Sequence, residues 1–112
     1  LGISDCITWT GMLKNDLKWG AYHSAELFCL PSHQENFGIV VAESLACRVP
    51  VAIAETVNIS DDIVNSRAGI VHKDTVKSTT KALNKWLNAT DDSKKAMAER
   101  GYNLYLRKYN FE

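Results

Sequence analysis

The stretch Leu27–Ile53 reads LFCLPSHQENFGIVVAESLACRVPVAI and decides the fold of the chain. It begins with a short apolar run that Pro31 ends, and a polar loop follows. After Gly38 the sequence becomes apolar again with a spacing that suits a helix, and Pro50 then precedes a second apolar run. This order of strand, loop, helix and strand predicts a βαβ unit, so we expect an α/β fold with a parallel sheet.

The loop after the first of these strands is predicted to carry the chemistry. In parallel sheets, ligands bind in the crevice outside the carboxyl ends of the strands. Two carboxylates flank this loop, Glu35 and Glu43, with seven residues between them. If the helix starts near Phe37 or Gly38, Glu35 lies just outside its N-terminus and Glu43 lies one to two turns inside it.

The N-terminus of this helix is predicted to bind an anion. The backbone N–H groups of Phe37, Gly38, Ile39 and Val40 have no partner within the helix, and the positive end of the helix dipole favours a phosphate. An ionised carboxylate only accepts hydrogen bonds, whereas a polyol offers several donors. Amides for a phosphate and acids for hydroxyls together fit a nucleotide sugar.

The run Pro31–Val51 resembles the signature of the family 4 retaining glycosyltransferases, which have the GT-B fold. Glu35 and Glu43 match the E-x7-E motif of that family, and Val49–Val51 matches the strand entry that follows it. The resemblance extends from about Ile7 to the C-terminus. It implies a Rossmann-like three-layer αβα arrangement with a short parallel sheet, as part of a GT-B C-terminal domain.

The same resemblance implies an enzyme that moves a hexose from a nucleotide-diphosphate sugar to an acceptor hydroxyl with retention. Residues 1–112 are then expected to be an incomplete nucleotide-sugar-binding domain that is inactive alone. The acceptor-binding N-terminal domain of a GT-B enzyme, and the first strands of the C-terminal domain with their basic residues, have no counterpart in it. Family members of this type need no metal and no other cofactor. The base, the sugar and the acceptor are unknown.

The resemblance also implies roles for single residues. Glu35 would orient the transferred sugar as the catalytic residue, and the amides of Phe37–Val40 would hold the phosphate or the sugar hydroxyls. Glu43 would hold the ribose hydroxyls, and the alternative for its carboxylate is a surface ion pair. Asn58, in the loop after the next strand, is a further candidate for contact with the donor.

Upstream of the motif, Cys6–Thr10 is rich in β-branched and aromatic residues and predicts a strand that Gly11 ends. In the family, the loop after this strand meets the nucleotide base, so the resemblance implies this role for Leu13 and Asn15. The alternative is an ordinary loop in which Asn15 or Asp16 caps the next helix.

The remaining segments predict a sheet of about four strands flanked by helices. Further strands are expected at Val51–Ala54 and Gly69–Val71, and helices at Asp16–Ser24, Asp61–Asn65, Val76–Leu87 and Ser93–Tyr109. Arg48 stands where the family usually has Gly after the helix, and Arg67 stands where a small residue is usual. A left-handed conformation at such a position costs a residue other than Gly roughly 1 kcal/mol.

The order of strands in the parent fold is 3-2-1-4-5-6, and this chain holds the equivalents of strands 3 to 6. Strands 1 and 2, which separate strand 3 from strand 4, have no counterpart. We therefore expect one of two outcomes. Either Cys6–Thr10 pairs beside Leu27–Leu30, or another copy of the chain covers the exposed sheet edge and forms a homo-oligomer.

Composition excludes several classes of function. Thirteen basic and thirteen acidic residues cancel, which argues against binding of nucleic acid or an acidic membrane. The chain is 46% hydrophobic and has no apolar run of about 18 residues. Its three cysteines, Cys6, Cys29 and Cys47, lie in apolar settings and are predicted to be buried free thiols of a cytoplasmic protein.

Two other functions remain open. A non-catalytic Rossmann-like module could keep the scaffold for nucleotide binding or for interaction with a partner. A related GT-B enzyme, such as an epimerase or a synthase, is the third hypothesis, and the Phe37–Gly38 step after the first acid favours family 4 over it.

Overall fold

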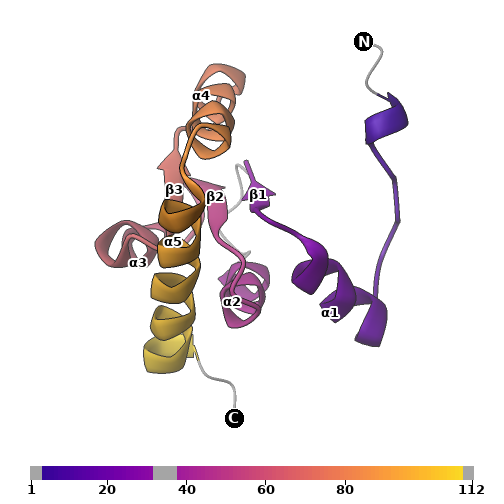
Figure 1. Cartoon of the computed structure of the whole chain (residues 1–112), viewed down its shortest axis with the longest axis horizontal. Helices are drawn as coiled ribbons and strands as arrows, with labels where there is room; N and C mark the ends of the chain where they lie inside the picture. Colours follow the sequence, from indigo (N-terminus) through magenta and orange to yellow (C-terminus); the bar gives the residue numbers. More distant parts are fainter. Residues whose placement is uncertain (1–3, 32–37, 110–112) are drawn as a thin grey trace.

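The computed structural model describes residues 4–31 and 38–109 and shows an α/β fold (Figure 1). The strands are β1 (Phe28–Leu30), β2 (Val51–Ala54) and β3 (Gly69–His72). The helices are α1 (Asn15–Ser24), α2 (Gly38–Ala46), α3 (Ser60–Ser66), α4 (Val76–Leu87) and α5 (Asp91–Leu104). A 3-10 turn at Ser4–Cys6 precedes them, and a π-helical turn at Tyr105–Tyr109 follows them.

The three strands form one parallel sheet in the order β1-β2-β3. In the register, Phe28 lies opposite Val51, and Val51 lies opposite Gly69. Helix α2 connects β1 to β2, and helix α3 connects β2 to β3, so both connections are the crossovers that a parallel sheet requires. Strand β2 is central and every one of its residues is buried, which fits its uninterrupted apolar sequence.

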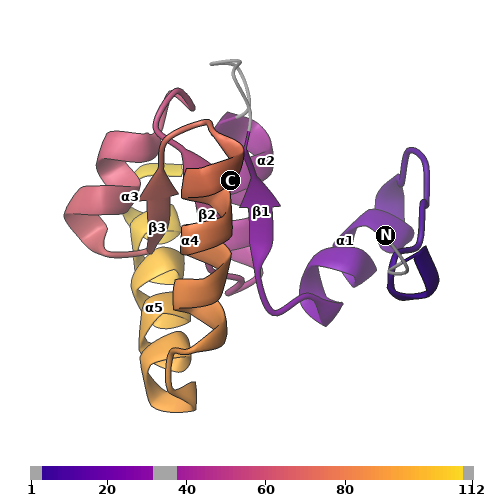
Figure 2. The same ribbon diagram turned by 90° about the horizontal axis from the view of Figure 1, so that it is seen from above.

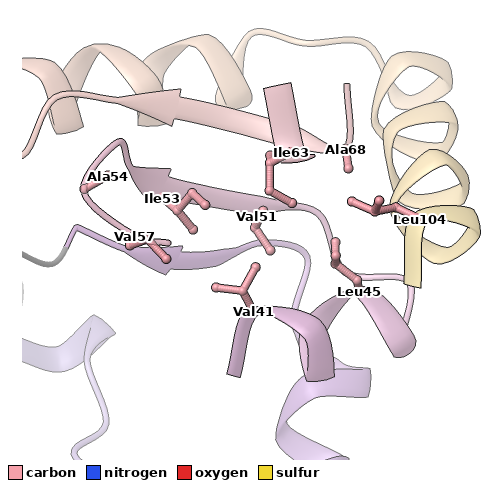
Figure 3. Close-up of a cluster of buried hydrophobic side chains, with 9 residues drawn as sticks. All are labelled: Val41, Leu45, Val51, Ile53, Ala54, Val57, Ile63, Ala68 and Leu104. Carbon is pink, nitrogen blue, oxygen red and sulfur yellow. The ribbon is translucent and has the colours of Figure 1, made fainter. Parts of the chain in front are cut away.

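The core lies on both faces of the sheet. On one face, Val51 and Ile53 of β2 pack against Val41 of α2, Ile63 of α3 and Leu104 of α5 (Figure 3). On the other face, Ala52 and Ile70 pack against Ala82 and Trp86 of α4. Figure 2 shows α4 in front of the sheet and α2, α3 and α5 behind it. The predicted three-layer αβα arrangement is therefore confirmed.

The prediction of a strand at Cys6–Thr10 is wrong. Residues 7–14 have no regular secondary structure, and the sheet of the described ranges has three strands instead of about four. Favourable composition makes a strand only where a neighbouring strand and a packed face receive it. Here the Trp9 side chain is 89% exposed, and Figures 1 and 2 both show this segment far from β1 on the outer side of α1.

The outer edge of β1 remains without a partner strand within residues 4–31 and 38–109. The prediction that Cys6–Thr10 pairs beside β1 is therefore wrong. The second outcome, in which another copy of the chain covers this edge, stays a prediction.

Other details of the chain follow the sequence closely. Strand β2 and helix α4 have the predicted bounds, and Thr75 caps α4 by accepting a hydrogen bond from the Ser78 amide at 3.1 Å. Arg48 and Arg67 are left-handed, with φ of 58° and 52°, as the pattern predicts.

The three cysteines are all free thiols, but their burial differs from the prediction. Cys29 and Cys47 are half-buried, whereas Cys6 is exposed because the segment around it does not pack on the sheet. Burial raises the pKa of the Cys29 thiol; burial and the nearby Glu43 carboxylate raise that of Cys47. Among the helices that the structure describes, none is long and apolar enough to cross a membrane.

Candidate functional site

Helix α2 begins with Gly38 at the carboxyl edge of the sheet, beyond the end of β1 at Leu30. Gly38, Ile39 and Val40 form its first turn, as predicted, so their amide N–H groups have no acceptor inside the helix. Gly38 and Val40 are half-buried, while the Ile39 side chain is exposed. The motif residues Glu35 and Phe37 lie outside the described ranges, so their predicted roles stay predictions.

Gly38 is in close contact with the loop that follows β2. A Cβ atom on Gly38 would lie 2.8 Å from Oδ1 of Asn58 and 3.2 Å from Cγ2 of Ile59. A larger residue than glycine would therefore push the Asn58 side chain away from the start of the helix. The contact places the Asn58 side chain beside the N-terminus of α2, and the contact with the donor predicted for Asn58 stays a prediction.

Glu43 lies on the second turn of α2 and faces helix α1. Its Oε2 accepts from Nζ of Lys18 at 2.9 Å, and its Oε1 accepts from the Tyr22 hydroxyl at 3.1 Å. The Glu43 side chain is only 12% exposed, so this ion pair is largely shielded from solvent. An ionised carboxylate offers about four lone-pair positions, and each oxygen of Glu43 therefore keeps a position for a further donor such as a ribose hydroxyl.

Tyr22 joins Glu43 to the rest of the site. Its hydroxyl is also 3.2 Å from the Val40 carbonyl oxygen, and its ring lies 5.8 Å from that of Phe28. Burial of the hydroxyl, together with its hydrogen bond to the charged Glu43, raises the pKa of Tyr22 well above its usual range. Tyr22 therefore stays protonated and acts as a donor.

A pocket of about 300 Å³ opens between the loop before α1 and one face of α1. This volume is at the lower end of the range typical of small-molecule sites. Thr10, Gly11 and the half-buried Leu13 line it on the loop side, and Lys18 and Tyr22 line it on the helix side. The two residues that bind Glu43 thus also form a wall of this pocket.

The structure separates the two residues that were predicted to meet the base. Leu13 lines the pocket, but Asn15 is exposed and does not. Asn15 is the first residue of α1 and is left-handed, with φ of 55°. Among the described residues, neither Asn15 nor Asp16 forms a capping hydrogen bond, and Lys14 at the N-cap position makes none with its side chain, so the capping alternative is wrong.

Sequence analysis missed Lys18 and Tyr22 as partners of Glu43. Residues four apart share one face of a helix, so their spacing was a signal that they act together. The contact between that face of α1 and α2 is tertiary, and the local sequence holds no signal for it. Within residues 4–31 and 38–109, no group of three His, Cys, Asp or Glu side chains could hold a metal ion.

This fold and this site define a class of protein. It has a parallel sheet with helices on both faces, and a helix N-terminus lies beside a carboxylate at the carboxyl edge, where α/β sheets bind their ligands. The family described as glycosyl transferases group 1 matches residues 1–104. The chain belongs to this family.

Relatives of known name agree with this assignment. D-inositol 3-phosphate glycosyltransferase from Gordonia bronchialis is 32% identical over 112 residues, which cover 99% of this chain and 24% of the relative. The protein of the same name from Mycolicibacterium smegmatis is 39% identical over 54 residues, covering 48% of this chain and 12% of the relative. The chain thus spans about a quarter or less of the length of these relatives.

A solved structure has the same fold. Sucrose-phosphate synthase from Thermosynechococcus elongatus superimposes with a TM-score of 0.80 over 94% of this chain and 26% of its own. The sequence identity is 20%, so the comparison concerns the fold. It confirms the prediction of a GT-B-type α/β arrangement.

Proposed function

We propose that this chain is the donor-binding portion of a retaining glycosyltransferase that uses a nucleotide-diphosphate sugar. The observation that carries the proposal is the placement of Glu43. Its carboxylate lies one turn beyond the open amides of α2, and its partners Lys18 and Tyr22 line the pocket that Leu13 borders on the loop side. A bound nucleotide sugar can therefore contact acid, amides and pocket at once.

The parts of the donor are assigned by their chemistry. The diphosphate lies at the first turn of α2, where Gly38, Ile39 and Val40 present amide donors and the helix dipole is positive. The ribose hydroxyls donate to Glu43, and the base enters the pocket beside Leu13. Asn58 is close enough to the start of α2 to contact the same phosphate.

The catalytic effect of such a site is mainly electrostatic. As the sugar leaves the diphosphate, negative charge grows on the phosphate oxygens, and preorganised amides stabilise that charge without reorganising. Glu35 orients the sugar that is transferred. The proposal assigns no metal and no cofactor to these steps. It places the acceptor on an N-terminal Rossmann-like domain of the whole protein, and it places the protein in the cytoplasm, because the three cysteines are free thiols.

The direct test is calorimetric titration of the chain with UDP, GDP and ADP. We expect one of the three to bind, and Glu43→Gln to weaken that binding at least tenfold, because an amide replaces one of the acceptor oxygens. Glu99→Gln is the matched control, since Glu99 is also in an ion pair, with Arg48 at 2.9 Å, and both side chains are exposed.

Three results would count against the proposal. If none of the three nucleotides binds, the chain is a scaffold or an interaction module. If a nucleotide binds but Glu43→Gln and Glu99→Gln behave alike, then Glu43 serves only its ion pair with Lys18. Binding without transfer by the full-length protein would favour the non-catalytic nucleotide-binding module.

The open edge of β1 supports one proposal about assembly. The edge offers unpaired backbone groups, and another copy of the chain can add its own strand to them. Sedimentation velocity over a range of concentrations tests this idea. We expect a dimer that dissociates on dilution, whereas a strictly monomeric particle would contradict it.

A further inference from the structure

The segment before β1, residues 4–27, is an arm that one stretch of chain joins to the body, which runs from β1 to the final π-helical turn (Figures 1 and 2). Helix α1 of the arm has ten residues, none of them buried. It includes Gly20, which weakens a helix, and its N-cap residue Lys14 makes no side-chain hydrogen bond. Isolated helices shorter than about 12–15 residues are marginal in water. Helix α1 therefore depends on contact with the body for its stability.

Within residues 4–31 and 38–109, the hydrogen bonds between arm and body all end on Val40 and Glu43 of α2. Lys18 donates to Glu43. The Tyr22 hydroxyl lies 3.1 Å from Oε1 of Glu43 and 3.2 Å from the Val40 carbonyl oxygen. Its single hydrogen serves only one of these acceptors at a time, and both distances exceed the usual value of about 2.7–2.8 Å. With the packing of the Tyr22 ring on Phe28, this attachment is small enough to open while the body stays folded.

The arm also supplies most of the pocket in which the proposed nucleotide places its base. All the residues that line this pocket belong to the arm, except Phe28 of β1. The amides of Gly38–Val40 and the carboxylate of Glu43 belong to α2 of the body. A nucleotide therefore contacts the pocket, the carboxylate and the amides together only while the arm is docked. Binding and docking are then linked, because a ligand favours the state that it binds better.

We propose that the arm is a clamp that closes on a bound nucleotide, so that nucleotide binding and docking of the arm strengthen each other. This inference rests on the proposed donor site and adds a means of regulating its affinity. Glu43 keeps its bonds to Lys18 and Tyr22 in the closed state, because each carboxylate oxygen has a further lone pair for a ribose hydroxyl. The fraction of molecules with an open arm lowers the affinity, so a more stable α1 raises it. By the same linkage, a bound nucleotide stabilises α1.

Amide hydrogen exchange in the presence of UDP, GDP and ADP tests the clamp. In the same samples, the amide resonances of Gly38–Val40 show whether a nucleotide binds at α2. At a nucleotide concentration of about ten times Kd, we expect exchange in α1 to slow about tenfold, because the arm then opens only after the nucleotide has left. The last turn of α4 is the internal control. It lies on the opposite face of the sheet from α2, and its local exchange should stay unchanged.

Two variants change the stability of α1 without changing the pocket. Gly20 and Leu17 are exposed residues of α1, and neither lines the pocket. A Cβ atom on Gly20 would meet no atom within 4 Å, so Gly20→Ala should favour the helix and tighten nucleotide binding by up to about threefold. Leu17→Gly should weaken binding by about threefold, because glycine disfavours a helix. Lys81→Gly is the matched control, since Lys81 is exposed on α4 of the body, and its affinity for the nucleotide should equal that of the native chain.

The outcomes separate the clamp from the donor site on which it rests. If a nucleotide moves the resonances of Gly38–Val40 but leaves exchange in α1 unchanged, the clamp is overturned and the donor site stands. The same holds if exchange in α1 becomes faster, which would mean that the nucleotide displaces Lys18 and Tyr22 from Glu43. Equal affinities of Leu17→Gly and the native chain would also overturn the clamp. If no nucleotide binds, both proposals fail.

Discussion

The body of the molecule, from β1 to the final π-helical turn, differs sharply from the arm that precedes it. In the body, Leu45, Ile53 and Ile63 are fully buried between the sheet and its helices. In the arm, α1 has no buried residue, and the Leu17 side chain is 71% exposed. Figure 1 shows the arm standing apart from the three layers.

This difference divides the candidate site into two halves of unequal stability. The amides of Gly38–Val40 belong to the body and are held by its core. The pocket at Leu13 is lined mostly by the arm, with Phe28 of β1 at its border with the body. The arm meets α2 mainly through the bonds of Lys18 and Tyr22 to Glu43. Glu43 is therefore both a proposed ligand contact and the point that joins the two halves.

The body and the arm should differ most in how much stability is lost when a leucine in each is replaced by alanine. Leu45→Ala should lower the free energy of unfolding by about 2–5 kcal/mol, because it leaves a cavity in a closed core. Leu17→Ala should change it by no more than about 0.5 kcal/mol, because the side chain is already exposed. Urea denaturation of both variants measures this. Similar losses for the two leucines would contradict the division into body and arm.

The next largest effect concerns the joint between arm and body. Tyr22→Phe keeps the ring beside Phe28 but removes the hydrogen bond to Glu43, which should cost α1 about 1–2 kcal/mol of local stability. Amide hydrogen exchange should speed up roughly tenfold in α1 and stay unchanged in β2. Faster exchange throughout the molecule would mean that the arm is part of the cooperative core.

At the C-terminal end of the body, Asp62 of α3 binds side chains of the last π-helical turn. Its carboxylate accepts hydrogen bonds from the Tyr109 hydroxyl and from Lys108, and these bonds, with the Tyr109 contact foremost, lower the pKa of Asp62. Because the folded-state pKa lies below that of the unfolded chain, this stabilisation is full above about pH 4 and is lost as the pH falls through the folded-state pKa.

Asp62→Asn should therefore reduce the fall in melting temperature below about pH 4, because the variant has no carboxylate to protonate at this position. Asp61→Asn is the control, since Asp61 is exposed and its side chain forms no hydrogen bond or ion pair in the part of the chain that the structure describes. Melting curves between pH 2 and 7 make the comparison. Identical acid profiles for the Asp62 variant and the native chain would refute the role of this contact.

The smallest expected effect is a gain in stability. Arg67 is left-handed, and within residues 4–31 and 38–109 its side chain forms no hydrogen bond, ion pair or ring contact that would offset the strain. Arg67→Gly should raise stability by about 0.5–1 kcal/mol, the relief of the left-handed strain minus the greater chain entropy of glycine. Arg48→Gly should gain less, because Arg48 pairs with Glu99 and stacks on Tyr102. Chemical denaturation measures both variants. Equal gains in the free energy of unfolding would show that the contacts of Arg48 with Glu99 and Tyr102 contribute nothing.

The sequence predicted those parts of the fold that local pattern determines. The apolar run of β2, the helix Val76–Leu87 and the left-handed Arg48 depend on residues close together in the chain, and all three are confirmed. The failure at Cys6–Thr10 has a physical cause, because a strand needs a partner strand, and local composition does not indicate whether one is present.

The same distinction applies to the candidate site. Glu43 and Gly38 could be found from the spacing of the motif, and the structure places both on α2. The pairing of Glu43 with Lys18 could not be found, because it joins elements whose relative placement only tertiary packing determines. The roles of Glu35 and Phe37 stay predictions.

The most direct test of the account is an NMR titration of the chain with UDP and GDP that follows the amide resonances of Gly38, Ile39 and Val40. The account predicts that one nucleotide shifts these three resonances saturably, and that Glu43→Gln weakens the titration at least tenfold. Unmoved resonances at the start of α2 would contradict a donor site at this helix.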